Sequence, residues 1–159
     1  SIRAIASNVA TVNRWSEPST PAAPQYPKNH VTETEGGHIE EFDDTPGAER
    51  YQRYHPAGTF VETHPDGTTV EKIVKDNYEI TLGDKYVHSD GSVQVNIVGN
   101  STIVVNGDAT TSVTGNRVDV VNGDYTIAVG GDFGVAVGGQ HTQGAGSRFQ
   151  ATAPRIDLN

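Results

Sequence analysis

The acidic side chains and the histidines are the groups through which this 159-residue chain could do acid–base or metal chemistry. Four carboxylates, those of Glu40, Glu41, Asp43 and Asp44, fall in one short polar segment. A carboxylate pair that cleaves glycosidic bonds needs two different environments, so that one group stays protonated while the other is ionised. No apolar segment beside these residues would supply the second environment. The sequence therefore predicts no catalytic residues and no enzyme activity.

The histidines do not have the spacing of a metal site within one chain. Zinc sites of the His-x-His or HExxH kind hold two imidazoles at a fixed short interval, and neither pattern occurs here. His55 and His64 each precede a proline, which favours turn capping. We predict no metal site and no cofactor, although a histidine on a threefold axis could bind an ion through three chains. The histidines are His30, His38, His55, His64, His88 and His141.

An eight-residue repeat dominates the elements that position these side chains. A fixed short period is typical of stacked repeat architectures, and an even period keeps side chains in phase. Glycine followed by Asn or Asp favours a corner between extended strands. The predicted corner glycines are Gly83, Gly91, Gly99, Gly107, Gly115, Gly123, Gly131 and Gly139. The predicted core column, two residues before a corner, is Ile97, Val105, Val113, Val121, Val129 and Val137.

The repeat has two faces. Positions two, four and six after each glycine share one face, which carries mostly Val, Ile, Tyr and Phe, whereas the opposite face is small and partly polar. We expect the first face to be core and the second to be exterior. Arg117 and Asp119 break this pattern, because they fall on the core face beside Val121. They are either paired inside or twisted outward at a local defect.

A calcium-binding β-roll is the main alternative for a glycine-rich repeat. Its nine-residue unit needs Gly-Gly-x-Gly-x-Asp. The period here is eight residues, and neither Gly130-Gly131 nor Gly138-Gly139 is followed by Gly-x-Asp. The Asn and Asp residues after the corner glycines are therefore predicted to be turn residues rather than calcium ligands.

One chain is too short to close such a rod alone. With three strands per turn, the eight octads give fewer than three coils, and both ends would expose unpaired strand edges. Three intertwined chains place each strand between strands of the partners. Because neighbouring strands lie about 4.8 Å apart, eight octads would form a rod about 40 Å long. The sequence therefore favours a homotrimer over a monomeric solenoid.

Composition narrows the possible functions. The chain has 20 acidic and 11 basic residues and a net charge of −9, which argues against nucleic acid as a partner. It contains no cysteine, so disulfides and thiolate metal sites are excluded. No apolar run is long enough to span a bilayer, and the first residues do not form a signal peptide. We expect stability to come from packing and oligomerisation.

The chain divides into four predicted segments of an all-β protein. Residues 1–29, rich in proline, are predicted to form an extended arm or linker, and residues 30–72 a small β collar. Residues 73–144 would form the octad rod, and residues 145–159 a C-terminal tip segment. The strands expected in the collar are Val31–Glu35, His38–Phe42, Arg50–Tyr54, Thr59–Thr63 and Thr68–Val74, the last two closed by a turn at 65–67.

Residues 26–50, with the sequence YPKNHVTETEGGHIEEFDDTPGAER, resemble the central spike protein of the baseplate of T-even-like contractile-tailed phages. The resemblance continues through residues 54–59 and 75–80 into the octads and ends near residues 155–157. The Asp-Asp-Thr-Pro-Gly motif followed by octads is also similar to the spike component of type VI secretion systems. The resemblance implies a homotrimeric, intertwined triangular β-helix that forms a needle at the tail tip of the virion.

The resemblance also implies partners. Members of that family carry an oligosaccharide-binding-type domain and a lysozyme domain ahead of the needle. We expect this chain to be the C-terminal fragment alone, so the hydrolase activity is not carried over. The baseplate hub and the upstream domains would lie at the N-terminal end. A small conical tip protein would cap residues 140–159, because the iron-binding His-x-His of some related spikes is absent. The residues expected to dock it are Arg155, Ile156, Asp157 and Leu158.

The leading functional hypothesis is a structural needle that sheath contraction drives through the host outer membrane. The alternative is a trimeric tail-fibre or adhesin-like shaft that recognises a cell-surface glycan. An adhesin usually presents variable aromatic or polar loops. The octads have no insertions, which favours the smooth shaft of a needle.

Overall fold

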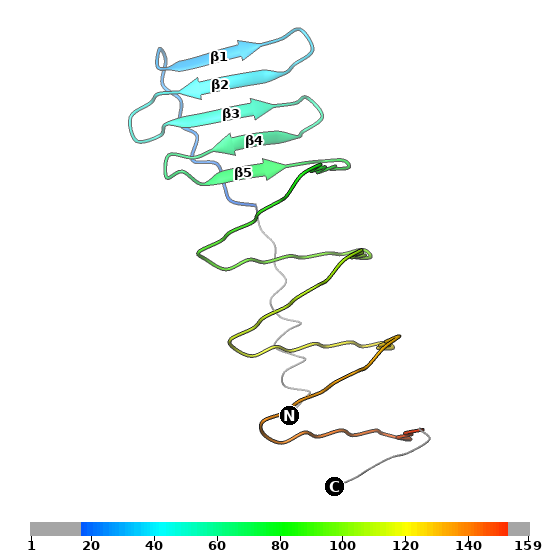
Figure 1. Ribbon diagram of the computed structural model, residues 1–159. Helices are drawn as coiled ribbons and strands as arrows, with labels where there is room; N and C mark the ends of the chain where they lie inside the picture. Colours follow the sequence, from blue (N-terminus) through cyan, green and yellow to red (C-terminus); the bar gives the residue numbers. More distant parts are fainter. Residues whose placement is uncertain (1–16, 153–159) are drawn as a thin grey trace. The chain divides into compact units, whose positions relative to one another are not determined.

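The computed structural model describes residues 17–152, and every regular element among them is a β-strand. The chain forms two units, Ser1–Thr110 and Thr111–Asn159. The first unit contains one five-stranded sheet in the order β1-β2-β3-β4-β5, with all neighbouring strands antiparallel (Figure 1). The strands are β1 (Asn29–Glu33), β2 (Ile39–Asp43), β3 (Arg50–Tyr54), β4 (Phe60–Thr63) and β5 (Thr69–Lys72). The predicted all-β class is confirmed for the described residues, and the strands lie within a few residues of their expected positions.

Each hairpin of the sheet turns at a glycine with a left-handed backbone. In the last hairpin Gly67 has a φ of 84°, and its N–H donates to the carbonyl of His64 at 2.9 Å. Asp66 Oδ1 accepts a hydrogen bond from the N–H of Thr68 at 2.9 Å. Glycine adopts positive φ at little cost, and aspartate favours the turn by bonding its own backbone two residues on. The Pro-Asp-Gly sequence therefore sets the β4–β5 turn where it was predicted.

Strand alternation divides the sheet into two faces. The first, which we call the covered face, carries Val31, Glu33, Ile39, Glu41, Asp43, Arg50, Gln52, Tyr54, Phe60, Glu62, Val70 and Lys72. The second, the open face, carries His30, Thr32, Glu40, Phe42, Tyr51, Arg53, Val61, Thr63, Thr69 and Glu71. On the open face the rings of Phe42 and Tyr51, paired in register, have centroids 4.8 Å apart.

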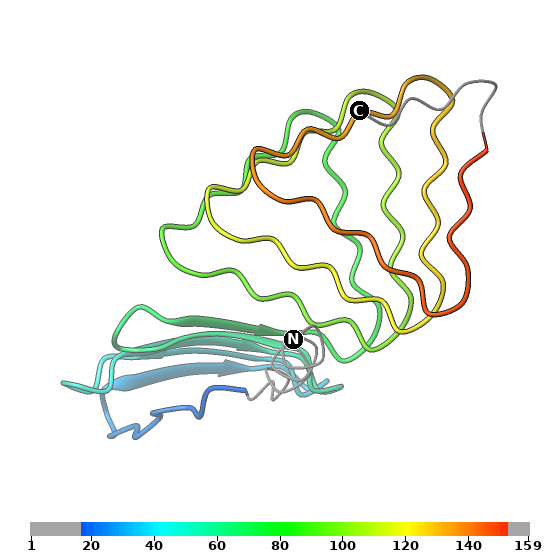
Figure 2. The same ribbon diagram turned by 90° about the horizontal axis from the view of Figure 1, so that it is seen from below.

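Residues 17–28 run along the covered face without forming a strand (Figure 2). At one end Lys72 Nζ donates to Glu17 Oε2 at 2.8 Å. At the other, the N–H of Gln25 donates to Thr45 Oγ1 at 2.9 Å, and the carbonyl of Lys28 accepts from the N–H of Asp44 at 3.1 Å. The rest of the predicted arm, residues 1–16, lies outside the described residues.

The residues after β5 repeat one local conformation in both units. Extended runs alternate with bends, and each bend falls on a corner glycine and the residue before it. Bends at 74–75 and 146–147 continue the same interval at either end. Within each unit the ribbon undulates between these bends (Figure 1). No strand is assigned from residue 73 to residue 152, although strands were expected there, because the extended runs have no neighbouring strand with which to form a ladder.

The sheet has no apolar core. Among the described residues no hydrophobic side chain is buried, and the buried residues are Glu41, Asp43, Thr45 and Glu62. The large apolar residues from Val74 to Phe149 are all exposed, among them Val93, Ile103, Tyr125 and Phe133. Hydrophobic burial is the main favourable contribution to folding. Within the described residues, the single chain obtains it only from partly buried side chains.

Candidate functional site

The predicted core column has one environment throughout its length. The exposed fractions of Ile97, Val105, Val113, Val121, Val129 and Val137 fall between 48% and 53%. Six side chains spread over both units can agree this closely only if each octad repeats the same local geometry. Within each unit the column residues are therefore evenly half exposed, and these apolar side chains are candidates for contact with another molecule.

The corner glycines bend the chain without left-handed backbone. Among the described residues, positive φ occurs at Gly37, Gly47, Gly58 and Gly67, and at none of the corners. A Cβ atom built on any corner glycine would meet nothing within 4 Å. The single chain thus imposes no steric requirement for glycine at these positions. Any such requirement must come from neighbouring molecules, and the role of the corner glycines stays a prediction.

Arg117 and Asp119, the charged interruption of the apolar face, bind each other. Arg117 Nε lies 3.1 Å from Asp119 Oδ2 and 3.3 Å from Asp119 Oδ1. The side chains are 59% and 54% exposed. The two residues are therefore paired, and they occupy the same face as Val121 by strand alternation.

Other charged groups of the octads also pair locally. Lys85 forms an ion pair with Glu79, and His88 Nε2 lies 3.0 Å from Asp90 Oδ1. These contacts are exposed, and surface pairs of this kind add little stability. In the part of the chain that the structure describes, no three His, Asp or Glu side chains gather in a way that could hold a metal ion.

A buried charged row crosses the covered face of the sheet. Arg50, on β3, forms an ion pair with Glu41 on β2 and lies 3.4 Å from Glu62 Oε2 on β4. Its Nη1 also donates to Gln52 Oε1 at 2.8 Å. Glu62 Oε1 lies 3.0 Å from His64 Nε2. The side chains of Arg50, Glu41, Glu62 and His64 are nine-tenths buried or nearly so.

Asp43 extends this row at the end of β2. It is paired in register with Arg50, and its Oδ1 accepts a hydrogen bond from the N–H of Thr45 at 3.0 Å. Hydrogen bonding by Thr45, through its side chain and its backbone, and the charge of Arg50 hold the pKa of Asp43 below its usual value against the opposing effect of desolvation. Asp43 is therefore ionised, and its role is to fix the turn after β2.

The sequence pattern marks the acidic segment but does not predict the row. Glu41 and Asp43 point to the covered face, whereas Glu40 points to the open face and accepts a hydrogen bond from the hydroxyl of Tyr51 at 2.8 Å. The alternation of β2 separates these neighbours. The register sets Gln52, not Arg50, between Glu41 and Glu62, so strand pairs alone would not have indicated the row.

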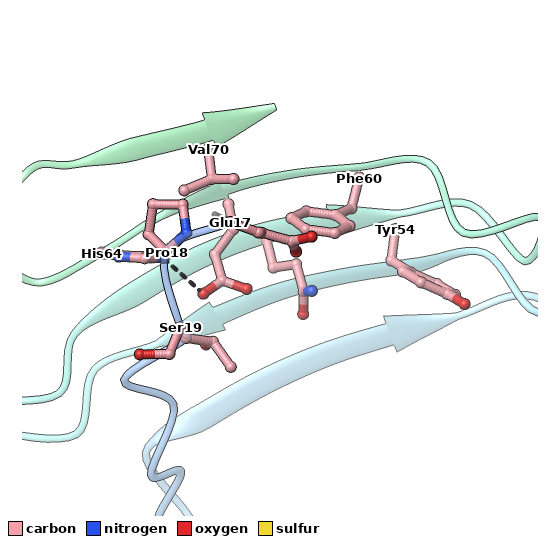
Figure 3. Close-up of a pocket in the computed structure, with 10 residues that line it drawn as sticks. Glu17, Pro18, Ser19, Tyr54, Phe60, His64 and Val70 are labelled. Atoms are coloured by element: carbon pink, nitrogen blue, oxygen red, sulfur yellow. Dashed lines mark ion pairs between the residues drawn. The ribbon is translucent and has the colours of Figure 1, made fainter. Parts of the chain in front are cut away.

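A pocket of about 490 Å³ adjoins the charged row, between residues 17–20 and the sheet. Figure 3 shows Tyr54, Phe60 and Val70 from the sheet on one side, and Glu17 and Pro18 close to His64. The carboxylates that face the pocket already have partners, Lys72 for Glu17 and both Arg50 and His64 for Glu62. The pocket can therefore accept an apolar group, but its carboxylates are engaged in structural ion pairs.

Two further predictions from the sequence concern the C-terminal docking residues and membrane-spanning segments. Arg155, Ile156, Asp157 and Leu158, expected to dock a tip protein, lie outside the described residues. Within residues 17–152 there is no helix of the length and apolar character needed to cross a membrane.

Comparison with known proteins shows that part of this chain is similar to phage Gp5 proteins. No protein-family profile matches the chain. Protein Gp5 of Vibrio phage KVP40 is 49% identical over 85 residues, which cover 54% of this chain and 20% of that protein. The pre-baseplate central spike protein Gp5 of Enterobacteria phage T4 is 38% identical, with 60% of this chain and 19% of that protein covered. The chain thus spans about a fifth of the length of the curated relatives it matches. The resemblance to phage baseplate central spike proteins is confirmed over that part.

Proposed function

We propose that this chain forms the needle of a phage tail spike, a structural device of the virion baseplate that pierces the host outer membrane when the sheath contracts. One observation carries the proposal most strongly. The chain repeats a regular apolar column that stays half exposed in isolation, and it is similar to a protein described as the pre-baseplate central spike of phage T4.

Three intertwined copies would account for this column. The extended octads carry backbone donors and acceptors with no strand beside them, and partner chains would supply both the missing ladders and the missing apolar contacts. Burial of a Val or Ile side chain contributes about 1.5–3 kcal/mol relative to exposure. Dozens of such side chains in a trimer would make a stiff and very stable rod.

The rod would act by its shape rather than by catalysis. Its predicted exterior is small and partly polar, and the chain has a net charge of −9, so a smooth shaft would pass through a membrane without a binding step. At its N-terminal end we propose contact with the baseplate hub and with the lysozyme and oligosaccharide-binding-type domains expected upstream. At the C-terminal end we propose a conical tip protein.

The solution mass of the purified chain tests the proposal. Sedimentation equilibrium should give three times the chain mass of 16.9 kDa, independent of protein concentration over the micromolar range. A monomer at these concentrations would contradict the intertwined needle, because the half-exposed column would then have no partner.

A further inference from the structure

The octad repeat leaves the alignment of its copies poorly specified. A shift of one chain by eight residues returns a glycine to every corner and a β-branched residue to almost every column position. Strand register is weakly specified wherever a shift restores the same pattern of faces. Three identical chains therefore need some non-repeating feature to select one alignment. Of the octads in the second unit, the one with Arg117 and Asp119 differs most from its neighbours.

The geometry of this octad suits contact with further copies. The pairing of Arg117 with Asp119 uses Nε, and a guanidinium carries five N–H donors in a planar fork. Its two terminal nitrogens can therefore bind a carboxylate from another chain. Both side chains are more than half exposed, so they are accessible to such a partner. Three copies at one height would bring together three guanidinium groups and three carboxylates, with no net charge.

We infer that Arg117 and Asp119 form an ionic layer that fixes the axial alignment of three copies of this chain, an inference that rests on the trimeric needle proposed above. One octad before, Asp119 is replaced by Thr111; one octad after, Arg117 is replaced by Tyr125 and Asp119 by Ile127. A chain shifted by one octad would place its charges beside these uncharged residues. A charged pair inside an apolar assembly costs desolvation energy that only matched partners offset, and single polar positions select register in coiled coils.

Disulfide trapping can read the alignment directly, because the chain contains no cysteine. Ala128 and Ala136 occupy the same exterior position of successive octads. With one strand layer per octad, they would lie about 4.8 Å apart on neighbouring chains. Ser112 and Ala128 are two octads apart and would lie about 9.6 Å apart, beyond the Cα separation that a disulfide spans. An Ala128→Cys/Ala136→Cys pair reports the aligned trimer, and a Ser112→Cys/Ala128→Cys pair reports a shift of one octad.

The test compares both reporter pairs in three backgrounds, with the mass of each trimer measured first. With the ionic layer intact, oxidation should link only Ala128→Cys/Ala136→Cys. With Arg117→Leu/Asp119→Val both reporters should link, to comparable extents, since the apolar layer no longer distinguishes the alignments. With the exchanged pair Arg117→Asp/Asp119→Arg, only the first reporter should link again. Arg117→Gln/Asp119→Asn keeps size and hydrogen bonding without charge, and it replaces the apolar variant if that variant does not assemble.

The outcomes separate the inference from the function on which it rests. A monomer in the unaltered background would contradict the needle itself. A trimer in which the uncharged variants still link only Ala128→Cys/Ala136→Cys would leave the needle standing and overturn the ionic layer. Linkage of neither reporter in the unaltered trimer would overturn the stacking from which the layer is argued.

Discussion

Lys72 Nζ binds Glu17 Oε2 at 2.8 Å, a contact that joins the last strand of the sheet to a residue 55 positions earlier. Lys72 Nζ also lies 5.8 Å from the ring centroid of Phe60. This contact places residues 17–20 beside Gln52, Phe60 and Glu62 of the covered face, next to the buried charged row. The pair is about half exposed, so the contact orients the segment more than it stabilises it.

The assembled chain should resist detergent. Separation of three interlocked chains would expose the entire apolar column at once, which raises the barrier to unfolding. We expect an unboiled sample to migrate as a trimer on a denaturing gel and a boiled sample to migrate as a monomer. Migration of both samples as monomers would argue against intertwining.

Arg50→Leu should destabilise the sheet by about 3–5 kcal/mol, because it leaves the carboxylates of Glu41 and Glu62 buried without their cation. Chemical denaturation monitored by circular dichroism would measure the change. The matched control is Arg53→Leu on the open face, where an exposed arginine is removed and a change within about 0.5 kcal/mol is expected. Equal effects of the two substitutions would mean that the charged row does not stabilise the sheet.

Gly67→Ala should cost about 1–2 kcal/mol, since alanine is strained at a φ of 84°. Gly115→Ala serves as the control, because Gly115 has no positive φ and no atom within 4 Å of an added Cβ. The comparison is made by denaturation of each variant, followed through the signal of the sheet. A larger loss from Gly115→Ala would show that neighbouring chains crowd the corners.

Acid should weaken the β4–β5 hairpin through Asp66. A hydrogen bond from the backbone of Thr68, and a smaller effect from its side chain, lower the pKa of Asp66. A carboxyl group with a lowered folded-state pKa contributes stability above its unfolded-state value, and that contribution is lost as the pH falls through the folded-state value. We expect Asp66→Asn to reduce the loss of stability as the pH falls below about 4, measured by denaturation at several pH values. An unchanged acid dependence would assign the loss to other carboxylates.

The stability that Tyr51 contributes is lost as the pH rises, not as it falls. Its hydrogen bond to Glu40 raises the pKa of the phenol. The stabilisation is complete below the unfolded-state value near 10 and is lost as the pH rises through the higher folded-state value. Tyr51→Phe should therefore make stability less dependent on pH above about 10, as read by denaturation, whereas Tyr78→Phe, an exposed position outside the sheet, should not. If the two variants show the same alkaline dependence, the Glu40 contact does not persist in solution.

The periodic features of this protein could be predicted from its sequence because they depend on local chemistry. Positive-φ glycines and Asp66 set the hairpins, and the eight-residue interval sets the bends. The charged row could not be predicted in the same way, since it depends on which residue of β3 lies opposite Glu41 and which residue of β4 lies opposite Gln52. Sequence also predicted strands in the octads, but a strand needs a neighbour, and a single chain supplies none to them.

The half-exposed column also bears on how the protein is made. A newly synthesised chain displays an apolar stripe beside open backbone groups, the combination that makes free strand edges prone to aggregate. Acquisition of structure after β5 would depend on encounters between chains, so its rate should rise steeply with concentration. At low concentration the chains would stay unassembled for longest. Assembly would therefore compete with aggregation as soon as synthesis of the chain ends.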